Sequence, residues 1–223
     1  MGLIVEEEEY ERLTPYVTAM IIIINIVVFI IEIVNYEIIE DYAFVPILFL
    51  SGKKLETLIT HMFLHGGVLH IFWNMYFAYV FCDDLESVYG HTNFLLFYII
   101  CGIGAATIHA ILCVALDNIF HTGLSYIPCI GASGALFGVL AAYAVFFPHR
   151  KLRIRYAGGY YTVAAWNFAI LYGISETILV VVGAFDYVAH TAHVGGFVTG
   201  MLAAYVYKYL ANVGVDIRYI KRE

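Results

Sequence analysis

The stretch CIGASGALFG, residues 129–138, places Ser133 among glycines at the start of a long apolar segment. Gly131 stands two positions before the serine, Gly134 follows it directly, and Gly138 comes five positions after it. Small residues in membrane helices usually let two backbones approach closely, so the stretch alone favours helix packing over a nucleophile. The choice between these interpretations depends on what the rest of the chain brings to the same place.

The composition of the chain is that of an integral membrane protein. Of its 223 residues, 62% are hydrophobic and only 13% are charged, and the mean hydropathy is +0.84. A helix needs about 20 apolar residues to cross a hydrocarbon core roughly 30 Å thick, and several segments approach that length. The composition therefore predicts an all-α, polytopic membrane protein with the lipid bilayer as its surroundings.

Six apolar segments are candidates for transmembrane helices, within a single membrane domain that covers residues 1–223. They span residues 16–34, 67–82 or slightly beyond, 93–116, 129–147, 161–182 and 191–210. Residues 35–66 are too polar and broken to span, but their apolar piece with an internal proline predicts a loop partly embedded in the membrane. Residues 1–15 and 211–223 are predicted to be cytoplasmic tails, the first of them acidic.

Lysine and arginine are distributed unevenly around these segments, which predicts an orientation. With the N-terminus inside, nine of the eleven basic residues face the cytoplasm and only Lys53 and Lys54 lie outside. Both termini are therefore predicted to be cytoplasmic. The second, fourth and sixth segments then enter from the outside, so His70, Ser133 and His193 in their first turns lie at similar depth.

Several classes of partner are disfavoured by the same sequence. The net charge of −7, with an acidic run at residues 6–9, argues against nucleic acid. The acidic start predicts no cleavable signal peptide, and the four cysteines lack CxxC spacing, so we interpret them as packing residues. His61 and His65 suggest a metal site with His70 only weakly, because no acidic or cysteine partner is close in sequence. We expect no metal and no cofactor.

Small residues recur every four positions in the fourth and sixth segments, which predicts a close seam between these two helices. The residues are Gly134, Gly138, Ala142, Ala192, Gly196, Gly200 and Ala204. Ser133 and His193 flank this seam, where an imidazole within reach of the hydroxyl would act as its general base. The alternative is that the histidine merely satisfies a buried hydroxyl.

His70 and Asn74 are four residues apart and project from one face of the second segment. As a structural clasp between helices, such a pair contributes about 0.6 kcal/mol. As a functional pair, it offers two donors to a developing oxyanion. The presence of these residues with Ser133 and His193 in one layer favours catalysis.

These motifs together resemble the rhomboid family of intramembrane serine proteases. The matching stretches are HIFWN at residues 70–74, GASG at 131–134 and AHVGG at 192–196, in this order on the second, fourth and sixth segments. The resemblance implies that Ser133 is the nucleophile and His193 the base of a dyad without a carboxylate. It implies an oxyanion hole of His70, Asn74 and the backbone N–H of Ser133, with Gly131 and Gly134 in supporting positions and Phe137 packed against the catalytic imidazole.

We therefore expect an intramembrane serine endopeptidase that cleaves transmembrane segments of membrane-protein substrates through an acyl-enzyme. The resemblance implies a multi-pass protein of the cell membrane whose site opens toward the extracellular side. It also implies lateral access for substrate near the second and fifth segments, gated by the end of the fifth and by residues 183–190. The alternatives are a catalytically inactive relative that binds transmembrane helices, and a transporter with an intramembrane histidine relay, although the internal repeat typical of transporters is missing.

Three polar residues in or beside the apolar segments have no role in the implied dyad. Glu176 is open to interpretation as a third catalytic member, but we expect its carboxylate to reach toward water from the end of its helix. His109 and His190 are expected to be interfacial or loop residues.

Overall fold

The computed structural model describes residues 3–5, 12–156, 158–182 and 189–213. The long helices are α1 (Tyr16–Val34), α5 (Val68–Tyr89), α6 (His91–Phe120), α7 (Ser133–Phe146), α8 (Ala165–Val181) and α9 (His190–Asn212). The short ones are α2 (Glu37–Tyr42), α3 (Pro46–Leu50), α4 (Thr57–Thr60) and the 3-10 turns η1 (His61–Phe63) and η2 (Leu124–Tyr126). Most of the two predicted tails and of the predicted gating loop, residues 183–190, lies outside the described residues.

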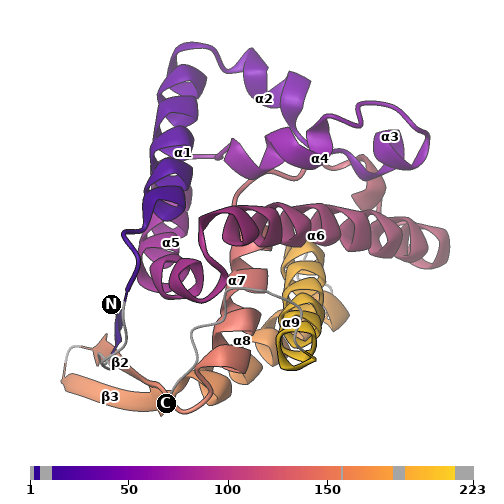
Figure 1. Ribbon diagram of the computed structural model, residues 1–223. Coiled ribbons are helices and arrows are strands. Elements are labelled where there is room, and N and C mark those ends of the chain that lie inside the picture. The colour runs from indigo at the N-terminus through magenta and orange to yellow at the C-terminus, as the bar shows by residue number, and fades with distance from the viewer. Residues whose placement is uncertain (1–2, 6–11, 157, 183–188, 214–223) are drawn as a thin grey trace.

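The long helices form two groups joined by α6. In Figure 1, α1 and α5 stand side by side, α6 runs across, and α7, α8 and α9 form the second group. The short helices α2–α4 lie at one end of the molecule and a small sheet lies at the other. By length and composition, α1 and α6 are apolar enough to cross a membrane, while α7 and α8 are apolar but shorter.

The chain is mostly helical, as predicted, but the connection between α7 and α8 forms strands that the prediction of an all-α fold did not include. The strands β1 (Leu3–Val5), β2 (Lys151–Tyr156) and β3 (Gly159–Ala164) form an antiparallel sheet in which β2 is central. Buried Leu152 and Ile154 alternate with exposed Lys151, Arg153 and Arg155, and this period of two is typical of a strand with one covered face. Residues 161–164, which were expected to open the fifth segment, belong to β3 instead.

Glu86 explains why α5 continues to Tyr89 instead of ending near Cys82. Its carboxylate is fully buried and accepts hydrogen bonds from the backbone N–H groups of Val17 and Thr18, each at 2.8 Å. The first N–H groups of a helix have no partner within it, so the last turns of α5 cap the start of α1. The acidic residues at 83–86 therefore do not mark the end of this helix.

A second buried charge ties α5 to the end of α7. Arg150 is 2% exposed and pairs with Asp84, whose carboxylate also accepts a hydrogen bond from the Tyr143 hydroxyl at 3.0 Å. The guanidinium lies 4.0 Å from the ring centroid of Phe147. Arg150, which was counted with the basic loop, is therefore part of the core.

The predicted seam between the fourth and sixth segments is confirmed as the contact of α7 with α9. A methyl group added to Gly196 would lie 1.8 Å from the carbonyl oxygen of Gly134, and one added to Gly200 would lie 2.2 Å from that of Gly138. Only glycine allows two backbones to approach so closely. The four cysteines are also buried and free, as predicted.

Candidate active site

Ser133 is the first residue of α7, and the loop before it is held by the segment between α1 and α5. Gly131 has φ +121°, a conformation that residues with a Cβ rarely adopt. Its N–H donates to the carbonyl of His61 at 2.8 Å, and Cys129 exchanges two backbone hydrogen bonds with Phe44. Residues 35–66 therefore set the point at which α7 begins.

The α7–α9 seam brings Ser133 and His193 together. Ser133 Oγ lies 2.9 Å from His193 Nε2, which is hydrogen-bond distance. His193 is 8% exposed, and its ring stacks on Phe137 with a centroid separation of 4.2 Å and an angle of 12°. Phe137 in turn stacks on Tyr172 of α8 at 5.2 Å. The imidazole is thus held both by a hydrogen bond and by a column of rings.

His70 and Asn74 lie four residues apart on α5, and His70 borders the loop before Ser133. The N–H of Gly66 donates to His70 Nδ1 at 3.3 Å, so the proton of the neutral ring is on Nε2. A methyl group added to Gly131 would lie 2.8 Å from this Nε2, so the His70 donor faces the loop before Ser133. Asn74 is 6% exposed, and its Nδ2 has no partner among the residues described here.

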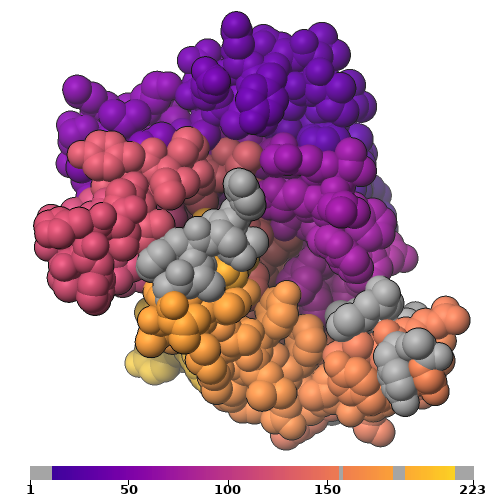
Figure 2. All heavy atoms as spheres, turned by 180° about the vertical axis from the view of Figure 1, so that it is seen from behind, coloured from indigo at the N-terminus to yellow at the C-terminus, as the bar shows by residue number. Residues whose placement is uncertain are grey.

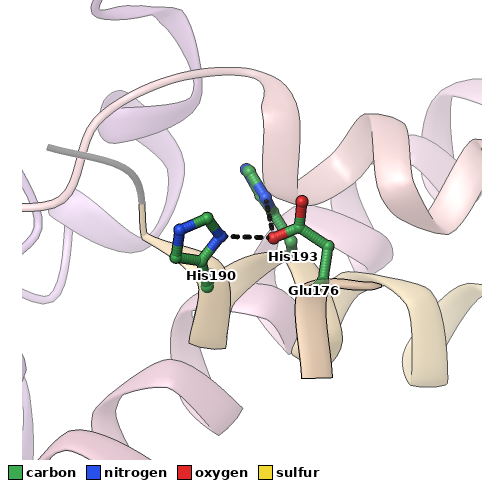
Figure 3. Close-up of side chains that lie close together, drawn as sticks. All are labelled: Glu176, His190 and His193. Atoms are coloured by element: carbon green, nitrogen blue, oxygen red, sulfur yellow. Dashed lines mark hydrogen bonds and ion pairs between the residues drawn. The ribbon is translucent and has the colours of Figure 1, made fainter. Parts of the chain in front are cut away.

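Glu176 overturns the expectation that its side chain reaches toward water. It is 7% exposed, and its Oε2 accepts hydrogen bonds from His193 Nδ1 at 2.9 Å and from His190 Nδ1 at 2.6 Å (Figure 3). His190 is equally buried, at 8% exposed, and is not a loop residue, because it begins α9. A carboxylate inside an apolar helix is costly unless it has a partner, so the sequence indicates that Glu176 needs one. The sequence does not indicate which residue is the partner, because that depends on how α8 is rotated against α9.

Glu176, His190 and His193 also form a cluster that could hold a metal ion, since one ligand atom from each lies within 4.8 Å of the others. Tetrahedral zinc holds its nitrogen and oxygen ligands at 2.0–2.1 Å, which separates two ligands by about 3.4 Å. The separations of 2.6 and 2.9 Å are instead those of direct hydrogen bonds.

Three further buried histidines, His61, His65 and His109, have structural partners. His109 is buried, against expectation, with Nδ1 at 2.5 Å from the Thr191 hydroxyl. His61, between α4 and α5, donates from Nδ1 to the Thr57 carbonyl at 2.7 Å, and burial lowers its pKa to about 4 although this hydrogen bond raises it. The backbone N–H of His65 donates to both carboxylate oxygens of Glu32, at 3.1 and 3.2 Å. The backbone of His61, through the Gly131 N–H, and that of His65, through Glu32, therefore fasten the 35–66 segment to its surroundings.

These features define a class of protein: a helical membrane protein whose central helices hold a serine–histidine pair inside the helical bundle. Residues 52–210 match the Rhomboid domain. Because this match covers most of the 223 residues of the chain, the chain belongs to the rhomboid family. The resemblance seen in the motifs is thereby confirmed.

Individual relatives are about a quarter to a third identical to this chain over the stretch that aligns with it. RHOMBOID-like protein 1 of Arabidopsis thaliana is 32% identical over 67% of this chain and 34% of its own length. Rhomboid protein 1, mitochondrial, of Saccharomyces cerevisiae is 31% identical over 66% and 40%. Inactive rhomboid protein 2 of Homo sapiens is 26% identical over 72% and 17%. The chain thus spans less than half the length of these relatives.

Proposed function

We propose that this chain is an intramembrane serine endopeptidase that cleaves transmembrane segments of membrane-protein substrates. The observation that carries the proposal is the 2.9 Å separation of Ser133 Oγ and His193 Nε2. Ser133 attacks the carbonyl carbon of the scissile bond while His193 takes its proton; His193 then gives this proton to the leaving amine as the C–N bond breaks. Water hydrolyses the resulting acyl-enzyme by the reverse use of the same pair.

The donors near Ser133 support a role in binding the oxyanion of the tetrahedral intermediate. The N–H of Ser133 belongs to the first turn of α7, where backbone donors have no intrahelical partner and the helix dipole favours negative charge. The Nε2–H of His70 faces the loop before Ser133, and Asn74 offers a buried donor on the same face of α5, one turn further on. We assign these three donors to the oxyanion hole.

Lateral access of a substrate helix is proposed between α5 and α8. A hollow lies between the magenta atoms of α5 and the orange atoms of α8 on the face drawn in Figure 2. The two helices pack mainly on other partners, α5 on α1 and α7, and α8 on α7 and α9. A substrate amide must leave its own helix before Ser133 can reach its carbonyl, because helical amides are hydrogen-bonded and covered.

We propose that α1 and α5–α9 are six transmembrane helices of a cell-membrane protein, with both termini in the cytoplasm. Strand β1, near the N-terminus, pairs with β2, so these segments lie on one side, together with the exposed bases Lys151, Arg153 and Arg155. An excess of basic residues is typical of the cytoplasmic side. Ser133 starts α7 and the sheet follows its other end, so the site opens outward.

The alternative of an inactive, helix-binding relative is favoured by one observation, the similarity to Inactive rhomboid protein 2. Treating the purified protein with a serine-reactive phosphonate and a single-span membrane substrate separates the two. We expect the phosphonate to label Ser133, the substrate to be cleaved, and both reactions to be lost in Ser133→Ala. If the folded wild type binds the substrate but shows neither reaction, the helix-binding function holds instead.

His70→Ala and Asn74→Ala are each expected to lower kcat by about 10²- to 10³-fold, as measured for loss of one oxyanion donor elsewhere. KM should change little, because the donors act on charge that develops only in the transition state. Steady-state cleavage of the same substrate measures both constants. Tyr79→Phe, at an exposed site on α5, is the control. A raised KM with unchanged kcat in the Asn74 variant would contradict the oxyanion role and indicate that Asn74 only joins two helices.

A further inference from the structure

We propose that Glu176 is the third member of the catalytic unit, a positioning residue that orients His193 toward Ser133, and that His190 holds Glu176 in place. The inference rests on the proposed function, but it departs from the two-residue dyad that the family resemblance implies. Three elements supply the chain of contacts: α7 with Ser133, α9 with His193 and His190, and α8 with Glu176.

The hydrogen-bond chain has one consistent arrangement of protons when Glu176 is ionised. A carboxylate has no proton to donate, so His193 donates from Nδ1 to Glu176 Oε2 over 2.9 Å. The neutral imidazole then presents the lone pair of Nε2 to Ser133 Oγ, also at 2.9 Å. This is the tautomer that a general base needs, and the carboxylate selects it.

His190 removes the freedom that Glu176 would otherwise have. It lies three residues before His193 and therefore on the same face of α9. Its Nδ1 donates to the same oxygen, Oε2, at 2.6 Å, and its ring stands nearly perpendicular to that of His193, at 85°. Two donors from one helix thus hold one carboxylate oxygen of the neighbouring helix, so the side chain keeps a single orientation (Figure 3).

The charge of Glu176 also acts on the transition state. Proton transfer from Ser133 makes His193 cationic at a place where His193 is 8% and Glu176 is 7% exposed. Opposite charges interact more strongly in such a medium than in water. Among the residues that the structure describes, the other ionisable groups near His193 are His70 from α5, His109 from α6 and His190 from its own helix, so Glu176 supplies the negative charge there. Among the described residues, Glu176 is the one that places a carboxylate in contact with the imidazolium formed during attack.

The same contacts would form if Glu176 only stabilised the packing of α8 on α9. The experiment must therefore distinguish an effect on the orientation of His193 from an effect on protein stability. We would compare Glu176→Gln and Glu176→Asp with wild type in the full chain, measuring kcat, KM and thermal unfolding. Glu176→Gln should lower kcat about 10²- to 10⁴-fold with KM nearly unchanged, as amide replacement of a triad carboxylate does. Glu176→Asp should restore part of kcat, since the charge remains. Glu37→Gln, at an exposed site in α2, is the matched control.

A readout that needs no activity keeps this inference separate from the proposed function. Nitrogen-15 NMR of histidine-labelled protein, assigned with His193→Ala, reports which ring nitrogen of His193 carries the proton. We expect Nδ1–H in wild type and a shift toward the other tautomer in Glu176→Gln and, more weakly, in His190→Ala. An unchanged tautomer with unchanged kcat, and only a lower unfolding temperature, overturns the inference. If wild type neither cleaves substrate nor reacts with the phosphonate, the proposed function fails, while the tautomer still decides the role of Glu176.

Discussion

Replacing Ser133 and His193 together with alanine is expected to slow cleavage no more than replacing either one alone. Each single change should lower kcat by about 10⁴- to 10⁶-fold, because the proposed nucleophile and its proposed base act as one unit and neither has a use without the other. The contact that couples them, 2.9 Å long, joins α7 to α9. Single-turnover cleavage of a single-span substrate, with enzyme in excess, measures all three variants.

The control for these variants is their folding. Unfolding followed with a thiol-reactive fluorophore suits this protein, because all four cysteines are buried and free in the native state. The alanine variants should unfold close to the wild type, since both remove a polar contact without opening the helix seam. Additive losses, with the double variant slower by the product of the two single effects, would contradict a shared mechanism.

Gly196→Ala is expected to have the largest effect on stability. Its new methyl group would lie 1.8 Å from the carbonyl oxygen of Gly134, and because both partners are backbone, α7 and α9 must separate. We expect a loss of about 3 kcal/mol or more, at or beyond the upper end for overpacking. Equilibrium unfolding in mixed detergent micelles, with the cysteines as reporters, measures the change.

The same variant should also lose activity, since Gly134 follows Ser133 directly and His193 lies one turn before Gly196. Gly173→Ala in α8 is the matched control: the atoms nearest to its methyl group would be those of the Phe197 ring, at 3.2–3.4 Å, and a side chain can move aside. We expect less than about 1 kcal/mol there. Equal losses for the two variants would show that the α7–α9 contact is not the tight seam described above.

The proposed role of Glu176 bears on how a family resemblance is applied to one chain. The motifs of the rhomboid family lie on α5, α7 and α9, and a role for α8 in the chemistry does not follow from them. Here α8 contributes both Tyr172, in the ring column on Phe137, and the carboxylate that contacts His193. An assay that scores only Ser133 and His193 would therefore leave the third contact undetected.

Much of the site could be predicted from local spacing in the sequence. The four-residue interval of His70 and Asn74 and the repeat of small residues around Ser133 and His193 are properties of a helix, which places residues three or four apart on one face. The glycines alone predict the close seam of α7 and α9. A Cβ at Gly196 would lie 1.8 Å from the carbonyl oxygen of Gly134, so only a residue without a Cβ fits there. For these features, one-dimensional spacing was enough.

The tertiary structure alone decided the contacts between groups with no shared periodicity. Whether Glu176 faces water or His193 depends on the rotation of α8 about its axis, and an apolar segment exposed to lipid on most sides carries little pattern to define that rotation. The burial of Arg150 against Asp84 and the pairing of β1 with β2 likewise join residues far apart in the chain. The sequence by itself thus determined the membrane class, the helix seam and the serine–histidine candidates. Packing decided which charges lie buried beside them, because the cost of a buried charge is relieved only by a partner that folding brings into contact.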